Sequence, residues 1–247
     1  MNIFSKSIVS FLGSICFGTI QVLCTEIPAK AQTLPPDVGL ITQLSGDATY
    51  WDGGLQKTPE KVQVYMKIRS GDHLKIAAGA MVQLVYFQNG RQETWKGPAA
   101  LIVGEVQSRV EGEKGLQEQP EVLILPTEAS QGMRRIPVLL RRARLGRSGG
   151  TLVRGGTEGT QKAIVPSRED RAEIAMAKET YQKLRRQTKA DDITPELNIL
   201  GILADYEQYE EMERVIKDAL KMQPNNEVLK ELGEWVRTQK LQPLTGK

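Results

Sequence analysis

Residues 80–95 have the sequence AMVQLVYFQNGRQETW, and this stretch decides the fold of the first half of the chain. Residues 80–87 are rich in strand-forming side chains, and Asn89-Gly90 follows almost at once. Asn-Gly favours the positive φ angles of a type I′ turn. Residues 91–95 then supply a returning strand. The stretch therefore predicts a β-hairpin.

Further short apolar runs lie on both sides of this hairpin, separated by turn residues. Residues 38–44 and 48–51 flank Gly46-Asp47, which predicts an earlier hairpin. Residues 99–103 and 121–125 supply further strands. Many short strands with turns between them are typical of a β-sandwich or a rolled sheet. We expect one all-β domain over residues 38–125.

The last third of the chain has the periodicity of helices. Ser167 and Asp170 have the spacing of a capping box at the start of the first helix. Thr194 is expected as the N-cap of the next helix, with Pro195 at its first helical position. Apolar side chains at spacings of three and four mark two more helices. We expect a small helical bundle over residues 167–240, which makes the chain α+β.

A basic, glycine-containing segment over residues 126–166 is expected to connect the two regions and to contain one short helix. A basic amphipathic helix here could lie on an anionic surface, either lipid or an envelope polymer. Alternatively, its leucines dock on the β domain while its arginines face water or pair with Glu105, Glu111 and Glu113. The candidate contacts with an anionic surface are Arg134, Arg135, Arg141, Arg142 and Arg144.

The first 31 residues have the pattern of a secretion signal. Lys6 supplies a positive charge, residues 8–23 are apolar, and Ala29-Lys30-Ala31 is a small-residue cleavage site. We expect cleavage between Ala31 and Gln32. The mature chain would then be periplasmic or secreted and would have no transmembrane helix. A signal segment retained as an anchor is the alternative.

Composition limits the chemistry of the mature chain. Cleavage would remove Cys16 and Cys24, the only cysteines, and with them any disulfide or cysteine ligand for zinc. A net charge of only +3 and an aromatic content of 5% do not favour a nucleic-acid partner. We expect no metal and no cofactor.

Candidate catalytic or ligand-binding side chains are few. His73 is the only histidine and follows a Gly-Asp turn. The acidic pairs Asp191-Asp192 and Glu210-Glu211 fit a solvated surface or a favourable contact with a helix N-terminus. Tyr50, Trp51 and Trp95 could form an aromatic sugar-binding strip, although strand aromatics more often pack in the core or against each other. We assign no catalytic residue.

The β region resembles the FecR-type periplasmic domain. The matching residues include Gly46-Asp47, Gly71-Asp72-His73-Leu74, Gly79 and the hairpin over residues 81–90. The resemblance implies an extracytoplasmic sensing or scaffolding module whose motif is structural rather than catalytic. Regulators of that family carry an anti-sigma segment and a membrane helix before this domain, whereas here a signal peptide precedes it. We therefore expect a soluble envelope module.

The helical region resembles a degenerate tetratricopeptide unit. Tyr209, Ile216, Ala219 and Pro224 have the spacing of the second half of that repeat. One unit is visible, and solenoids need several to bury a continuous core. We therefore expect a helical bundle with one tetratricopeptide-like hairpin, able to dock a protein partner.

Together these features predict an exported, non-enzymatic envelope protein in which a FecR-like binding or scaffold module carries a helical protein-interaction tail. The first alternative is a periplasmic sensor or regulator that works with a separate transmembrane partner. The second is an envelope hydrolase, which would need a nucleophile and a base that the sequence does not reveal.

Overall fold

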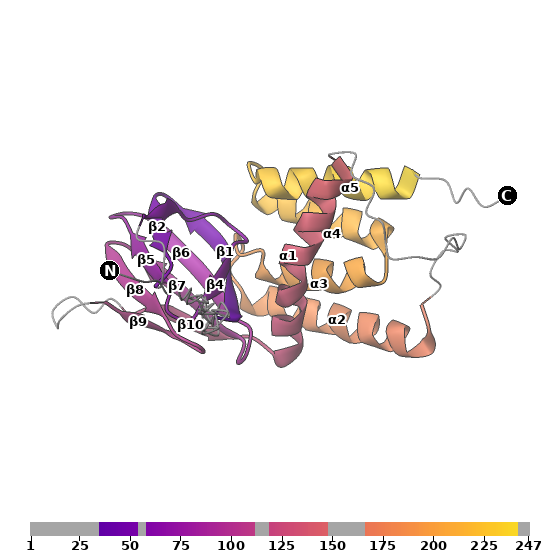
Figure 1. Cartoon of the computed structure of the whole chain (residues 1–247). Helices are drawn as coiled ribbons and strands as arrows, with labels where there is room; N and C mark the ends of the chain where they lie inside the picture. Colours follow the sequence, from indigo (N-terminus) through magenta and orange to yellow (C-terminus); the bar gives the residue numbers. More distant parts are fainter. Residues whose placement is uncertain (1–34, 54–57, 112–118, 148–165, 242–247) are drawn as a thin grey trace, which may run out of the picture. The chain divides into compact units, whose positions relative to one another are not determined.

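The computed structural model describes residues 35–53, 58–111, 119–147 and 166–241. They form ten strands followed by five helices, which confirms the predicted α+β class with the β region first (Figure 1). The strands are β1 (Asp37–Ser45), β2 (Ala48–Trp51), β3 (Glu60–Lys61), β4 (Lys67–Arg69), β5 (His73–Ile76), β6 (Met81–Tyr86), β7 (Arg91–Lys96), β8 (Ala99–Val103), β9 (Ser108–Val110) and β10 (Glu121–Ile124). The helices are α1 (Thr127–Arg147), α2 (Arg168–Gln187), α3 (Thr194–Asp205), α4 (Tyr209–Met222) and α5 (Glu227–Leu241).

The strands form two five-stranded antiparallel sheets. The first has the order β10-β7-β6-β1-β4, and the second has the order β3-β2-β5-β8-β9. Ile41 and Leu84 of the first sheet share one buried cluster with Leu74 and Leu101 of the second. Of the two architectures that the sequence left open, the structure therefore has the sandwich.

Strands β6 and β7 form the expected hairpin, with Met81 opposite Lys96 and Val85 opposite Gln92. The expected type I′ turn is wrong, because Gly90 has a positive φ of 66° whereas Asn89 does not adopt a positive φ. The turn is longer: the backbone N–H of Gly90 donates to the Tyr86 carbonyl at 3.1 Å. Asn89 shapes this turn through its side chain, whose Oδ1 accepts from the Arg91 backbone N–H at 3.0 Å.

Alternate side chains of β6 enter two different cores. Val82 and Leu84 face the second sheet, while Val85 belongs to a cluster shared with the helices. Leu40 and Phe87 join Val85 in that second cluster. The first sheet is therefore covered on both faces, which explains why the apolar run of β6 is nearly continuous rather than alternating.

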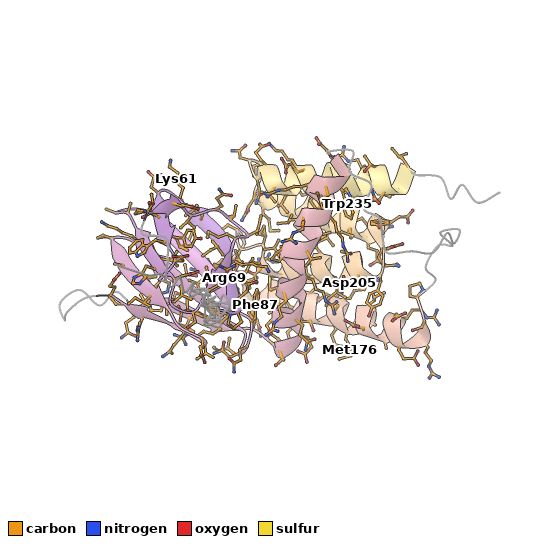
Figure 2. The ribbon with its side chains drawn as sticks, in the orientation of Figure 1. Lys61, Arg69, Phe87, Met176, Asp205 and Trp235 are labelled. Carbon is orange, nitrogen blue, oxygen red and sulfur yellow. The ribbon has the colours of Figure 1, made fainter. Side chains whose placement is uncertain are left out.

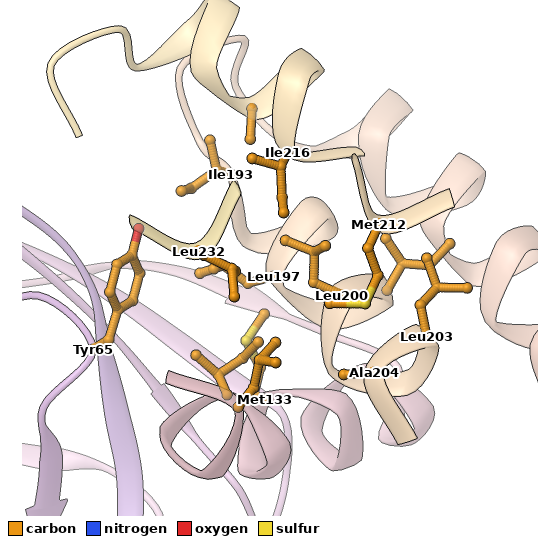
Figure 3. Close-up of a cluster of buried hydrophobic side chains, with 14 of the residues drawn as sticks. Tyr65, Met133, Ile193, Leu197, Leu200, Leu203, Ala204, Met212, Ile216 and Leu232 are labelled. Atoms are coloured by element: carbon orange, nitrogen blue, oxygen red, sulfur yellow. The ribbon is translucent and has the colours of Figure 1, made fainter. Parts of the chain in front are cut away.

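Helix α3 lies at the centre of the helical bundle. Every side chain from Thr194 to Ala204 is buried, and the helix packs against α1, α2 and α4. Figure 3 shows how one cluster draws on several elements, with Tyr65 reaching in from the β region and Met133 from α1. Leu200 of α3 and Met212 of α4 lie in the same cluster, and both are fully buried.

The helix starts agree only partly with the sequence. The capping box of α2 is present, since Ser167 Oγ accepts from the Asp170 N–H at 3.1 Å and Asp170 Oδ2 accepts from the Ser167 N–H at 2.8 Å. The expectation for Thr194 is wrong by one residue: Ile193 is the N-cap, and Thr194 is the first helical residue. Asp192 does the capping instead, because its Oδ1 accepts from the Thr194 N–H at 2.9 Å.

The segment expected to be a connector contributes helix α1 to the bundle. Met133, Ile136 and Leu139 of α1 are buried, and the helix packs on α3 and α5. Gly132 and Gly201 allow α1 and α3 to approach closely, because a Cβ on Gly201 would come within 3.0 Å of the Gly132 carbonyl oxygen. The leucines of the segment therefore pack mainly among helices rather than only on the β domain. Residues 148–165 lie outside the described part.

A buried polar network joins the sandwich to the bundle. Asp192, which precedes α3, accepts from Gln83 Nε2 of β6 at 3.1 Å and from Gln92 Nε2 of β7 at 2.9 Å. Gln83 Nε2 also lies 3.1 Å from Thr194 Oγ1. All of these side chains are at most 4% exposed. A second link is made by Asn226, whose Nδ2 donates to the Tyr65 hydroxyl at 2.8 Å.

This junction combines an apolar cluster with a polar network, and each stabilises the other. The shared apolar cluster excludes water, which makes the hydrogen bonds to Asp192 costly to break. Those hydrogen bonds in turn tie the loop before α3 to the middle of the first sheet. We conclude that the sandwich and the bundle form one body, in agreement with the single compact unit Pro35–Lys247.

Candidate functional site

Helix α1 has an outward face that carries most of the candidate arginines. Arg134, Val138, Arg141 and Leu145 follow one another at spacings of four, three and four residues, and all are exposed. Residues at these spacings lie on one face of a helix. Arg142 is exposed beside them. We call these five residues the basic stripe.

Arg135 differs from the other candidate arginines because its charge is balanced inside the protein. Its Nη2 lies 3.0 Å from Glu173 Oε1, and its Nε lies 3.2 Å from Asp205 Oδ2. A hydrogen bond from Tyr206, together with the Arg135 guanidinium, lowers the pKa of Glu173. The same hydrogen bond raises the pKa of Tyr206 to about 12. Arg135 therefore ties α1 to α2 and to the end of α3.

The remaining four arginines face outward. Arg134 lies over the ring of Phe87, with its Cζ 5.4 Å from the ring centroid. Figure 2 shows Phe87 where the sandwich meets α1. Arg141, Arg142 and Arg144 are exposed, and no ion pair joins them to another residue in the described ranges. Of the carboxylates expected as partners, Glu111 lies beside His73 instead, and Glu113 is outside the described residues.

Helix α2 presents a second outward face of different character. Ala172, Ala175, Met176 and Glu179 are exposed at the spacing of one helix face. Met176 is 56% exposed and projects from the outer side of α2 (Figure 2). An exposed methionine beside small apolar residues can adapt to the surface of a partner. We call these four residues the α2 face.

A cleft of about 380 Å³ opens where the sandwich meets the loop between α2 and α3. Its lining includes Gln43, Thr94 and Lys96 from the first sheet, and Lys189 and Asp191 from the loop. Gln83 and Asp192 of the buried network form part of its floor. The lining carries charges of both signs, so the cleft would suit a small polar molecule better than a strongly charged one.

The aromatic side chains do not form the strip that the sequence left open. Trp51 and Trp95 lie on different faces: Trp95 is 3% exposed inside the sandwich, where its Nε1 donates to buried Glu93 at 2.9 Å. Tyr50 packs against the same core. Trp51 instead stacks on His73, with ring centroids 5.1 Å apart. His73 Nδ1 lies 3.1 Å from Glu111 Oε1, so the imidazole has an aromatic and an acidic neighbour.

The acidic pairs have unequal roles. Asp192 is buried, so the expectation of a solvated surface fails for it, whereas the expected contact with a helix N-terminus holds. Glu211 pairs with Lys178 of α2. Across the described ranges, no group of three or more His, Cys, Asp or Glu side chains is placed to hold a metal ion.

One further carboxylate, Glu196, is fully buried in the bundle. Burial raises its pKa, while Arg185 opposes that shift with Nη1 at 3.0 Å from Glu196 Oε2. The Tyr181 hydroxyl donates to Glu196 at 3.2 Å. Every side chain of this cluster has a partner within it, which fits a structural ion pair at the base of α3.

The proposed cleavage site, Ala31 and Gln32, lies outside the described residues. Within the part of the chain that the structure describes, no helix combines the length and the apolar character needed to cross a membrane.

Comparison with protein family models, with curated proteins and with solved structures finds no match for this chain. The resemblances to the FecR-type domain and to tetratricopeptide units therefore stay predictions from the sequence.

Sequence reasoning missed the junction network and the α2 face. Gln83 was a weak signal, because glutamine within an apolar strand must find a buried partner or face water, whereas Gln92 lies in the mostly polar strand β7 and gave no such signal. Their partner Asp192 is about a hundred residues away in sequence, so no local pattern joins them.

Proposed function

We propose that this is an exported, non-enzymatic binding or scaffold protein of the bacterial envelope, in which the β-sandwich is a FecR-like module and the helical bundle contacts a protein partner. The signal-like segment over residues 1–31 and the turn residues of the β region support export and the FecR-like assignment. The helical bundle supplies the contact surface.

The observation that carries the proposal is the junction through Asp192. Because Gln83 and Gln92 tie the loop before α3 to the sheet, the bundle does not depend on a ligand for its orientation. A preordered surface loses less conformational entropy on binding than a flexible one. The sandwich thus supports the outward faces of the helices at a fixed angle, as a scaffold requires.

The α2 face is the part of the bundle best suited to a protein partner. Its exposed alanines and Met176 offer apolar contact area, whereas the inward side of α2 already packs on α3. Glu179 sits at the end of the face. The partner would be a protein with a complementary apolar surface, and Met176 would lie near the centre of the contact.

The test is site-specific photocrosslinking in living cells with the full chain. A deletion of residues 167–247 would not isolate the partner contact, because it also removes α3 and exposes the inward face of α1. A photoreactive amino acid at Met176 should yield a protein adduct, and the same group at exposed Lys75 on the second sheet should not. Identical adducts from both positions, or none from Met176, would contradict the proposal.

The identity of the adduct separates two roles. A soluble partner supports the scaffold role, whereas a partner with a transmembrane segment supports the alternative of a regulator.

The proposed export is tested by sequencing the N-terminus of the protein from the envelope fraction. It should begin at Gln32, and an intact Met1 in the cytosolic fraction would contradict export.

A further inference from the structure

The basic stripe presents both positive charge and aliphatic surface to solvent. Arg141 and Arg142 make no ion pair with any other residue in the described ranges, and Val138 and Leu145 leave 50% and 39% of their surfaces exposed. With a rise of about 1.5 Å per residue, Arg134 to Leu145 spans roughly 16 Å along the helix axis. The stripe is therefore long enough to touch several ligand groups at once.

The charges of the stripe specify an anionic ligand. Five arginines of α1 have described side chains, whereas the sequence of the helix contains one acidic residue, Glu128. Among the residues that the structure describes, Arg135 is the one of these arginines that is balanced by carboxylates of other helices. Guanidinium groups bind phosphate oxygens through paired hydrogen bonds, so phosphate-bearing ligands fit this face.

The exposed aliphatic side chains favour a lipid surface over a soluble polyanion. Val138 lies between Arg134 and Arg141 on the same face, and Leu145 lies one turn beyond. At a membrane surface, such side chains enter the boundary between headgroups and acyl chains while the arginines stay at the phosphates. A soluble polyanion would leave both of them in water.

We propose that the basic stripe binds peripherally to membranes that contain anionic phospholipids. This goes beyond the proposed function and does not depend on it, because the contact needs no protein partner. The inward face of α1 is fixed in the bundle core by Met133, Ile136 and Leu139. The helix therefore does not fold on the membrane, and the contact is shallow, reversible and sensitive to salt.

The test uses the purified full chain and flotation with vesicles. One set of vesicles contains phosphatidylglycerol in phosphatidylcholine, and the other contains phosphatidylcholine alone. Binding should require phosphatidylglycerol and weaken at high salt. Arg134→Gln, Arg141→Gln and Arg142→Gln combined should weaken binding roughly 100-fold, since each basic residue near an anionic surface contributes about a fivefold effect.

The matched control removes three charges from a different face. Lys61, Lys75 and Arg109 are exposed on the second sheet, so replacing all three by Gln changes the net charge equally. We expect this control to weaken binding less than threefold. Val138→Ser should weaken binding severalfold without changing the charge. The arginine variant keeps Arg135, and an unchanged urea midpoint would show that its fold is intact.

Three outcomes would overturn the proposal. Equal losses in the two triple variants would mean attraction by net charge alone. Equal binding to both vesicle types would mean that a retained signal segment, not the stripe, makes the contact. Full displacement by soluble polyphosphate, with no effect of Val138→Ser, would assign the stripe to a polyanion instead of a bilayer.

Discussion

At the residue scale, Asp192 links two parts of the fold through three hydrogen bonds. It accepts from Gln83 and Gln92 of the sheet and from the backbone of Thr194 at the start of α3. Buried donors that lose their acceptor keep the full cost of desolvation. A single substitution here should therefore affect the sheet, the helix start and the junction together.

We expect Asp192→Asn to lower the free energy of unfolding by about 1–3 kcal/mol, because one carboxylate oxygen is replaced by an amide donor that faces another donor. Urea denaturation measures the change. Asp191→Asn is the matched control, since Asp191 is exposed and only its backbone carbonyl accepts from Gln223. Equal effects of the two substitutions would show that the network at Asp192 does not hold the junction.

Contacts between residues close in sequence could be predicted from the sequence, and contacts between distant residues could not. The Ser167–Asp170 capping box involves residues three apart, so its spacing alone revealed it. Asn89-Gly90 marked the hairpin correctly, but the choice of turn type depended on loop length, which the sequence left open. The role of Asp192 depends on strands about a hundred residues away.

At the element scale, helix α1 has two faces of different character. Its inward face belongs to the bundle core, and its outward face carries the basic stripe. The sequence revealed the arginines, but a stretch that mixes arginine, leucine and glycine also fits a connector. Helix α1 joins the core because it packs against α3, where Gly201 lies close to the backbone of Gly132.

Gly201→Ala should destabilise the protein by about 1–3 kcal/mol, because the added methyl group would force the α1 and α3 backbones apart. Gly233→Ala in α5 is the control. Its added Cβ would lie 3.3 Å from the nearest atom, a methyl group of Ile216, and alanine improves helix propensity by about 1 kcal/mol. Thermal or urea unfolding should therefore give a loss for Gly201→Ala and little change or a gain for Gly233→Ala. A neutral Gly201→Ala would argue against the close crossing.

At the scale of the whole molecule, the junction should respond to alkaline pH. Tyr65 is buried at the junction, and burial raises its pKa from 10.0 to about 12. Because the pKa of Tyr65 is raised in the folded state, its contribution to the free energy of unfolding is fully present below pH 10. That stability is lost as the pH rises from 10 to about 12, because the unfolded chain releases the phenolic proton first.

Unfolding free energies measured between pH 9 and 11.5 should therefore fall less steeply for Tyr65→Phe than for the natural chain. The difference should approach one proton, about 1.4 kcal/mol per pH unit, within the window from pH 10 to 12. Tyr181 and Tyr206, whose pKa values are also raised to about 12, remain in both proteins and cancel in the comparison. Parallel pH profiles would mean that Tyr65 ionises as freely in the folded protein as in the unfolded one.

The central claim is that the sandwich and the helical bundle form one body, because the proposed scaffold role of the α2 face depends on it. The Trp235→Phe variant tests it, since its remaining tryptophans, Trp51 and Trp95, lie in the sandwich. Urea unfolding of this variant is followed by tryptophan emission for the sandwich and by circular dichroism at 222 nm for the helices. We predict that the two curves superimpose as one cooperative transition. Loss of helical signal at a urea concentration where the sandwich emission is still native would contradict the account.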